Sequence, residues 1–126
     1  MTESQARRDR PQAGPFVHTR LRAEVERLKT EPAWRDGDRN AITLTRSAGV
    51  TLVVTILRQG AALREHRAPG AATLQVISGG MALRVGDQSL ELGPGDVVAM
   101  EPGLRHAGEA RADTAFLLTL VEARPT

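Results

Sequence analysis

From residue 42 onward, apolar and polar positions alternate with a period of two, which is typical of half-buried β-strands. Short runs rich in β-branched residues are separated by turns that contain Gly, Pro or Asp. This spacing favours an all-β sandwich or barrel over alternating strands and helices. The pattern predicts about eight strands, with the sequences ITLTR, VTLVVTILR, ALREH, ATLQVIS, MALRV, SLEL, VVAM and TAFLLTLVEA.

The segment before these strands has helical periodicity instead. Leu21, Val25 and Leu28 recur at spacings of four and three, so they form one apolar stripe on a helix. Thr19 is expected to cap the start of this helix, and Pro32 is expected to end it. The sequence therefore predicts one short amphipathic helix ahead of the strands.

These patterns divide the chain into three parts. Residues 1–15 are polar, carry Pro and Gly and show no periodicity, so a disordered tail is expected. Residues 16–40 form a helical arm in which Trp34 is expected to anchor the arm on the barrel, followed by a loop over residues 35–40. Residues 41–126 form the β-barrel domain.

Composition excludes several function classes. The chain has 126 residues and a formal net charge of only +2, with no Cys and no Tyr. Disulfides, zinc–thiolate sites and a cysteine nucleophile are therefore excluded. With two Phe and one Trp the chain lacks the aromatic platforms of single-strand binders, so no nucleic-acid partner is expected.

The chain also lacks the apolar segments that direct proteins to membranes. No apolar run approaches the roughly 18 residues of a membrane-spanning helix, so no membrane association is expected. The first ten residues are polar and charged and contain no apolar core of a secretory signal, so a cytoplasmic location is expected. The Arg- and Ala-rich, Lys-poor composition is typical of a GC-rich bacterial genome.

The stretch from Gly60 to Ala110 resembles the two-part motif of the cupin superfamily. Both histidines of the match, His66 and His106, stand at the positions of metal-ligand histidines in that motif. The motif glycines that match are Gly60, Gly79, Gly95 and Gly103, and the positions that depart are Ala68, Ala72, Glu101 and Ala110. The resemblance covers about residues 41–122 and is that of a small single-domain, RmlC-like cupin.

The resemblance implies a fold and a damaged metal site. The implied fold is a cupin-type double-stranded β-helix, or jelly-roll barrel, preceded by the short N-terminal helix. Ala68 and Ala72 stand where the second His and the Glu of the metal site belong, so only His66 and His106 remain as metal ligands. A functional site needs about three protein ligands. A divalent transition metal such as Zn, Fe, Mn or Ni is therefore expected to bind weakly if it binds, and Gln75, Glu65 and His18 are the candidates for a third ligand.

The two alanines are also expected to leave space inside the barrel. The predicted ligand pocket surrounds the two histidines and is lined by His66, His106, Arg64, Gln75, Leu74, Val76 and Met100. Strict alternation turns Gln75 away from this interior unless the Pro69–Gly70 turn inserts a bulge. Arg64 has two interpretations, a carboxylate-binding residue of the pocket or a rim residue paired with a neighbouring acid.

Two functional hypotheses follow from this partly emptied site. The first is a cupin that binds or senses a small molecule without catalysis. The second is a metal-dependent cupin enzyme of the dioxygenase or isomerase type, whose two-histidine site is completed by water or by another ligand. A homodimer is also expected, because cupins commonly pair through a sheet face and because apolar strand faces such as Val50–Leu57 need a cover.

Overall fold

The computed structural model describes residues 12–123, and most of the tail predicted for residues 1–15 lies outside that range. The fold is the predicted jelly roll, with two antiparallel sheets and a short helical arm. In chain order the elements are α2 (Leu21–Lys29), α3 (Pro32–Asp36), β1 (Arg39–Ser47), β2 (Val50–Leu57), β3 (Ala62–Arg67), β4 (Ala72–Ser78), β5 (Met81–Val85), β6 (Gln88–Leu92), β7 (Val97–Met100), β8 (Arg105–Ala110) and β9 (Thr114–Val121).

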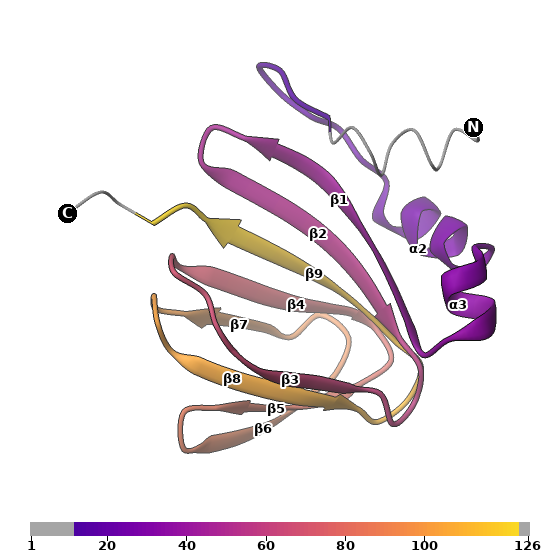
Figure 1. The fold of residues 1–126 in the computed structure, drawn as a ribbon, viewed down its shortest axis with the longest axis vertical. Helices are drawn as coiled ribbons and strands as arrows, with labels where there is room; N and C mark the ends of the chain where they lie inside the picture. Colours follow the sequence, from indigo (N-terminus) through magenta and orange to yellow (C-terminus); the bar gives the residue numbers. More distant parts are fainter. Residues whose placement is uncertain (1–11, 124–126) are drawn as a thin grey trace.

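The two sheets face each other and enclose the main core (Figure 1). One sheet has the strand order β1-β2-β9-β4-β7, and the other has the order β3-β8-β5-β6. Leu74 and Phe116 from the first sheet and Leu83 from the second are each at most 1% exposed. Because side chains alternate along each strand, one face of each sheet supplies this core and the other face points outward.

The helical arm builds a second core on the outer face of the first sheet. Val25, Leu28 and Trp34 are buried there against β1, β2 and β9, beside β1 in Figure 1. This confirms the helical stripe and the anchoring role of Trp34. The Asn40 side chain ties the arm down, because its amide nitrogen donates to the backbone oxygen of Leu28 at 3.0 Å. No helix within residues 12–123 is long and apolar enough to cross a membrane.

One expectation about the arm, the helix cap, is wrong, and another, the role of Pro32, is incomplete. Thr19 does not cap the helix: the cap position is held by Arg20, whose side chain makes no capping hydrogen bond. Pro32 does not only follow the first helix but starts α3, because a proline is favoured in the first helical turn, where its missing N–H costs nothing. The loop expected over residues 35–40 is correspondingly short, since α3 reaches Asp36 and β1 begins at Arg39.

The alternation pattern also missed one strand. The segment RHAGEA forms β8, so residues 12–123 hold nine strands rather than eight. This segment has no β-branched or aromatic residue, and its strand conformation is set by pairing with β3 on one side and β5 on the other. Gly108 fits the crowded centre of that sheet, because a Cβ there would lie 3.1 Å from both the Ala82 oxygen and the Met81 Cε.

Candidate functional site

His66 and His106 lie side by side on neighbouring strands, where His66 is exposed and His106 is half-buried. His66 on β3 and His106 on β8 are directly paired across the two strands. Their ring centroids are 5.5 Å apart and the ring planes are perpendicular. The Nδ1 atom of His106 lies 3.2 Å from the backbone oxygen of Leu104, so an N–H at Nδ1 leaves Nε2 as the acceptor of that ring. The expected convergence of the two imidazoles is thus present in the fold.

A β-bulge in β3 turns the exposed His66 to the side of the strand that faces the cavities. Leu63 pairs with Gly108 and His66 pairs with His106, so three steps along β3 match two steps along β8. Leu63 packs against the main core, and strict alternation from Leu63 would send His66 to the outer face. The extra residue at Arg64–Glu65 reverses the alternation, as bulges commonly do next to functional sites.

A cavity of about 820 Å³ opens beside the two histidines, between β2 and β3. Of the residues predicted for the pocket, the structure brings together His66, His106, Arg64 and Leu74 on its walls. Further apolar walls come from Leu63, Phe116 and Leu118, and a hydroxyl comes from Thr55. The cavity therefore combines an apolar surface with two imidazoles, the guanidinium groups of Arg39 and Arg64 and the carboxylate of Asp38.

Three predicted pocket residues do not line this cavity. Gln75 is exposed, because strict alternation along β4 turns it to the outer face between buried Leu74 and Val76. The bulge that was considered after Pro69–Gly70 does not change its direction: β4 keeps its register with β9 from Ala72 to Val76. Val76 and Met100 do face inward, but they are only 1% and 4% exposed and belong to the packed core.

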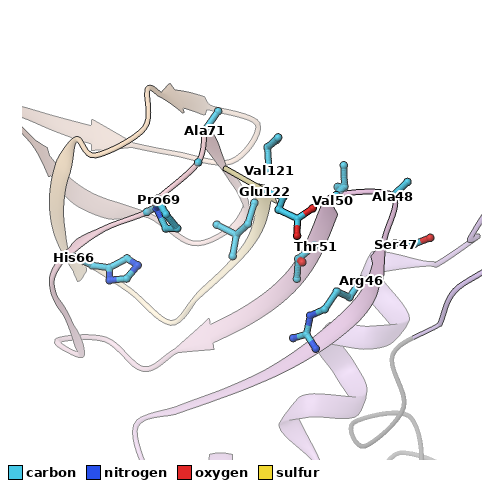
Figure 2. Close-up of a pocket in the computed structure, with 14 residues that line it drawn as sticks. Arg46, Ser47, Ala48, Val50, Thr51, His66, Pro69, Ala71, Val121 and Glu122 are labelled. Carbon is cyan, nitrogen blue, oxygen red and sulfur yellow. The ribbon is translucent and has the colours of Figure 1, made fainter. Parts of the chain in front are cut away.

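A second cavity, of about 340 Å³, lies at the open end of the barrel (Figure 2). It is enclosed by the β1–β2 turn, the β3–β4 loop and the end of β9, and its walls include Arg46, Thr51, His66, Leu120 and Glu122. In Figure 2 the side chains of Arg46 and His66 approach the same space from opposite walls. His66 therefore lines both cavities.

The arginines that line the cavities differ in their partners. Arg39 at the rim binds Asp38 with two hydrogen bonds, from Nε at 2.9 Å and from the terminal nitrogen at 3.2 Å. These hydrogen bonds from Arg39 lower the pKa of the exposed Asp38 carboxyl. By contrast, Arg46 and Arg64 form no ion pair with any residue between positions 12 and 123. Their charges are available to a ligand.

The residues present do not fit the metal site of the fold. Within the described part of the chain, no three His, Asp or Glu side chains converge to hold a metal ion. Among the candidates for a third ligand, Glu65 lines a small hollow that includes His106 but not His66. Gln75 faces outward, and His18 lies in the exposed arm. Two imidazoles fall short of the roughly three protein ligands of a typical catalytic site. No metal-dependent step is derived from this donor set.

Several residues that line the cavities were not predicted, although the pattern along β2 indicated some of them. Thr51 and Thr55 share one face of β2 with Leu57, while Leu52, Val54 and Ile56 share the other. When a strand is apolar on both faces but carries hydroxyl groups on only one, the face with the hydroxyls is the one expected to border a hydrated cavity. Arg46 carried no such signal, because its direction depends on an irregularity of β1 that the pattern does not show.

Comparison with known proteins identifies the family of this architecture. The model of the family described as Cupin domain matches residues 53–122, more than half of the chain. That span contains both histidines and most of the wall of the larger cavity. No curated protein matches the chain.

Solved structures with the same fold are distant in sequence. A conserved protein of unknown function from Streptococcus pyogenes is 21% identical, with a TM-score of 0.68 over 90% of this chain and 100% of that one. A cupin superfamily protein from Desulfitobacterium hafniense is 19% identical, with a TM-score of 0.64 over 67% of this chain and 77% of that one. A salicylate 1,2-dioxygenase variant from Pseudoaminobacter salicylatoxidans is 15% identical, with a TM-score of 0.72 over 80% of this chain and 33% of that one. At these identities the likeness concerns the fold alone.

Proposed function

Because this chain belongs to the cupin family, we propose that it is a small-molecule-binding cupin, which holds an organic ligand in the cavity beside His66 and His106. The observation that carries this proposal is the cavity of about 820 Å³ between β2 and β3. Small-molecule sites are concave, about 300–1,000 Å³ in volume and mostly apolar, with a few polar groups that orient the ligand. The walls of this cavity have that composition.

The chemistry of the walls supports binding rather than a reaction. Leu63, Phe116 and Leu118 offer apolar contact, and Thr55 and the two imidazoles offer hydrogen bonds. Ala68 and Ala72, at the positions that the family motif gives to metal ligands, present only methyl groups and are buried. A ligand that displaces water from this interior gains its affinity from the apolar walls and its orientation from the polar groups.

A matched pair of variants tests this proposal. Thr55→Trp adds bulk inside the cavity, whereas Gln75→Trp adds the same bulk to the exposed outer face of β4. We expect a panel of small organic acids, amides and sugars to contain at least one compound that raises the melting temperature of the wild type. A ligand at a hundred times its Kd stabilises the folded state by about 2.7 kcal/mol.

The same compound should stabilise Gln75→Trp as it does the wild type and leave Thr55→Trp unchanged. Equal stabilisation of both tryptophan variants would place the ligand elsewhere and overturn the proposal. A panel without any stabilising compound would also count against it.

A metal-dependent cupin enzyme is the second candidate. One observation favours it: the two imidazoles stand on directly paired positions, with centroids 5.5 Å apart, so both face the same cavity. Elemental analysis of protein purified without added metal separates the two candidates. Near-stoichiometric transition metal that disappears in a His66→Ala/His106→Ala double variant would favour the enzyme and overturn the first proposal.

The homodimer expected from the sequence stays a prediction. Light scattering at micromolar concentration measures it directly, and a monomer would contradict it.

A further inference from the structure

We infer that the ligand is an organic anion, whose carboxylate binds Arg46 on one wall of the smaller cavity while its body extends toward His66 on the opposite wall. This inference rests on the proposed function and names the class of ligand and a residue that recognises it. The observation behind it is that two separate β-bulges, one in β1 and one in β3, direct these two side chains into one space.

The bulge in β1 determines where Arg46 points. Thr43 pairs with Val53 and Thr45 pairs with Leu52, so two steps along β1 match one step along β2. Ile42 and Leu44 face the helical arm, and strict alternation would place Arg46 on that same buried side. With the extra residue, Thr45 takes the arm-facing place and Arg46 turns to the cavity side.

The bulge in β3 does the same for His66 from the opposite wall, as described above. Each bulge breaks the regular hydrogen-bond ladder of its strand, and such irregularities are concentrated where a side chain must be re-aimed at a site. The two strands belong to different sheets and neither bulge depends on the other. Their convergence on one cavity of about 340 Å³ is therefore more informative than either one alone.

The charges in this cavity favour an anion. Arg46 has no ion-pair partner among the residues that the structure describes. A guanidinium group binds a carboxylate through two parallel hydrogen bonds. Glu122 also lines the cavity, and its carboxylate lies over Gly49 rather than in an ion pair with Arg46.

The position of His66 gives the rest of the ligand a direction. His66 lines both cavities, so a ligand whose carboxylate is held by Arg46 and whose body reaches His66 points toward the larger cavity. There Phe116 and Leu118 supply an apolar wall. The geometry thus fits a carboxylic acid with a compact aromatic or aliphatic body.

Two pairs of probes that differ only in charge test this inference: benzoate against benzamide, and hexanoate against hexanamide. Binding is measured by calorimetry on the wild type, on Arg46→Met and on the control Arg35→Met. Arg35 is an exposed arginine of α3 outside both cavities, so its loss lowers the net charge equally. We expect an acid to bind the wild type about tenfold or more tightly than its amide, because hydrogen bonds to charged groups are the stronger ones.

Arg46→Met should remove that preference for the acid, and Arg35→Met should keep it. A preference that survives in Arg46→Met would overturn the role of Arg46. If an acid and its amide bind the wild type equally and neither binds Thr55→Trp, the inference that the ligand is an anion is overturned. The proposed function would still stand in that case. Failure of both acids to bind the wild type at millimolar concentration would overturn this inference, and the wider panel above would then decide on the proposed function by itself.

Discussion

The two halves of the barrel interior are built from the same alternating strands yet differ in how they are filled. Between β4 and β5, Leu74, Val76 and Leu83 interdigitate and are at most 1% exposed. Between β2 and β3, threonines, histidines and arginines stand among the apolar side chains around two cavities. The two regions share one fold but differ in how deeply their side chains are buried.

The difference lies in strand regularity as well as in residue type. The β4–β7 and β5–β8 pairings run without a register shift, and the β4–β9 pairing shifts only at its end, between Val76 and Ser78. By contrast, β1 and β3 each contain a bulge beside the cavities. In a regular pairing every second side chain faces the core. A bulge reverses this alternation, so the side chains after it point to the other face of the sheet. The packed half thus supports stability, and the irregular half offers a site. The following predictions break or sharpen this contrast.

The largest expected effect is the loss of a core side chain from the packed half. Leu83→Ala should lower the free energy of unfolding by about 2–5 kcal/mol, because Leu83 is fully buried and its neighbours cannot collapse into the space. Leu63→Ala, on the wall of the larger cavity, should cost about 1 kcal/mol or less. Urea denaturation measures both values, and equal losses would show that the two halves are packed alike.

The second prediction asks whether the irregular half can hold a metal once ligands are returned. Ala68→His with Ala72→Glu places a histidine and a carboxylate at the two positions that the family motif assigns to ligands. Because Ala72 is only 3% exposed, the added carboxylate should destabilise the protein without metal. Zn²⁺ at a hundred times its Kd should restore about 2.7 kcal/mol, and the wild type should gain less. Thermal unfolding with and without Zn²⁺ measures both; equal gains would show that the four positions do not converge.

A third, smaller effect concerns the loop that closes the end of the smaller cavity. A Cβ on Gly70 would lie 1.8 Å from the backbone oxygen of Val121, so Gly70→Ala must push the β3–β4 loop away from β9. Overpacking of this kind costs about 1–3 kcal/mol. Gly93→Ala is the matched control, because no atom lies within 4 Å of its Cβ position. Denaturation curves that coincide for the two variants would contradict this close contact.

The smallest effect is electrostatic. Glu122→Gln removes the one carboxylate that lines the smaller cavity, so benzoate should bind about twofold more tightly. Glu101→Gln, in an exposed turn outside both cavities, serves as the control for net charge. Calorimetry at low ionic strength measures the change, and a weaker affinity in Glu122→Gln would show that Glu122 contributes a contact to the ligand.

Most of the fold could be predicted from the sequence. The period-two pattern located eight strands, because each has an apolar face that one sheet buries. It could not locate β8, since the sequence Arg105–Ala110 has no apolar alternation and becomes a strand through its two neighbours. The cap of α2 was predicted one residue too early, at Thr19, because threonine is a favoured cap residue and arginine is not.

The candidate site could be predicted only in part. The family motif brought His66 and His106 together, and alternation along β4 correctly turned Gln75 outward when it was followed strictly. Arg46 and the true direction of the β3 side chains depend on bulges, which add one residue without changing the composition of the strand. Val76 and Met100 have the right direction, but the pattern cannot separate a cavity wall from a packed core.

The helical arm described above also has a consequence for how the chain must be handled. It shields the outer apolar face of the first sheet, where Ile42, Leu44, Val54 and Ile56 lie. A version shortened to begin at β1 would expose these side chains to solvent, next to the free edge of β1. Exposed apolar patches at a sheet edge promote aggregation. The arm therefore reduces the tendency of the protein to aggregate, and any truncated version should start before Leu21.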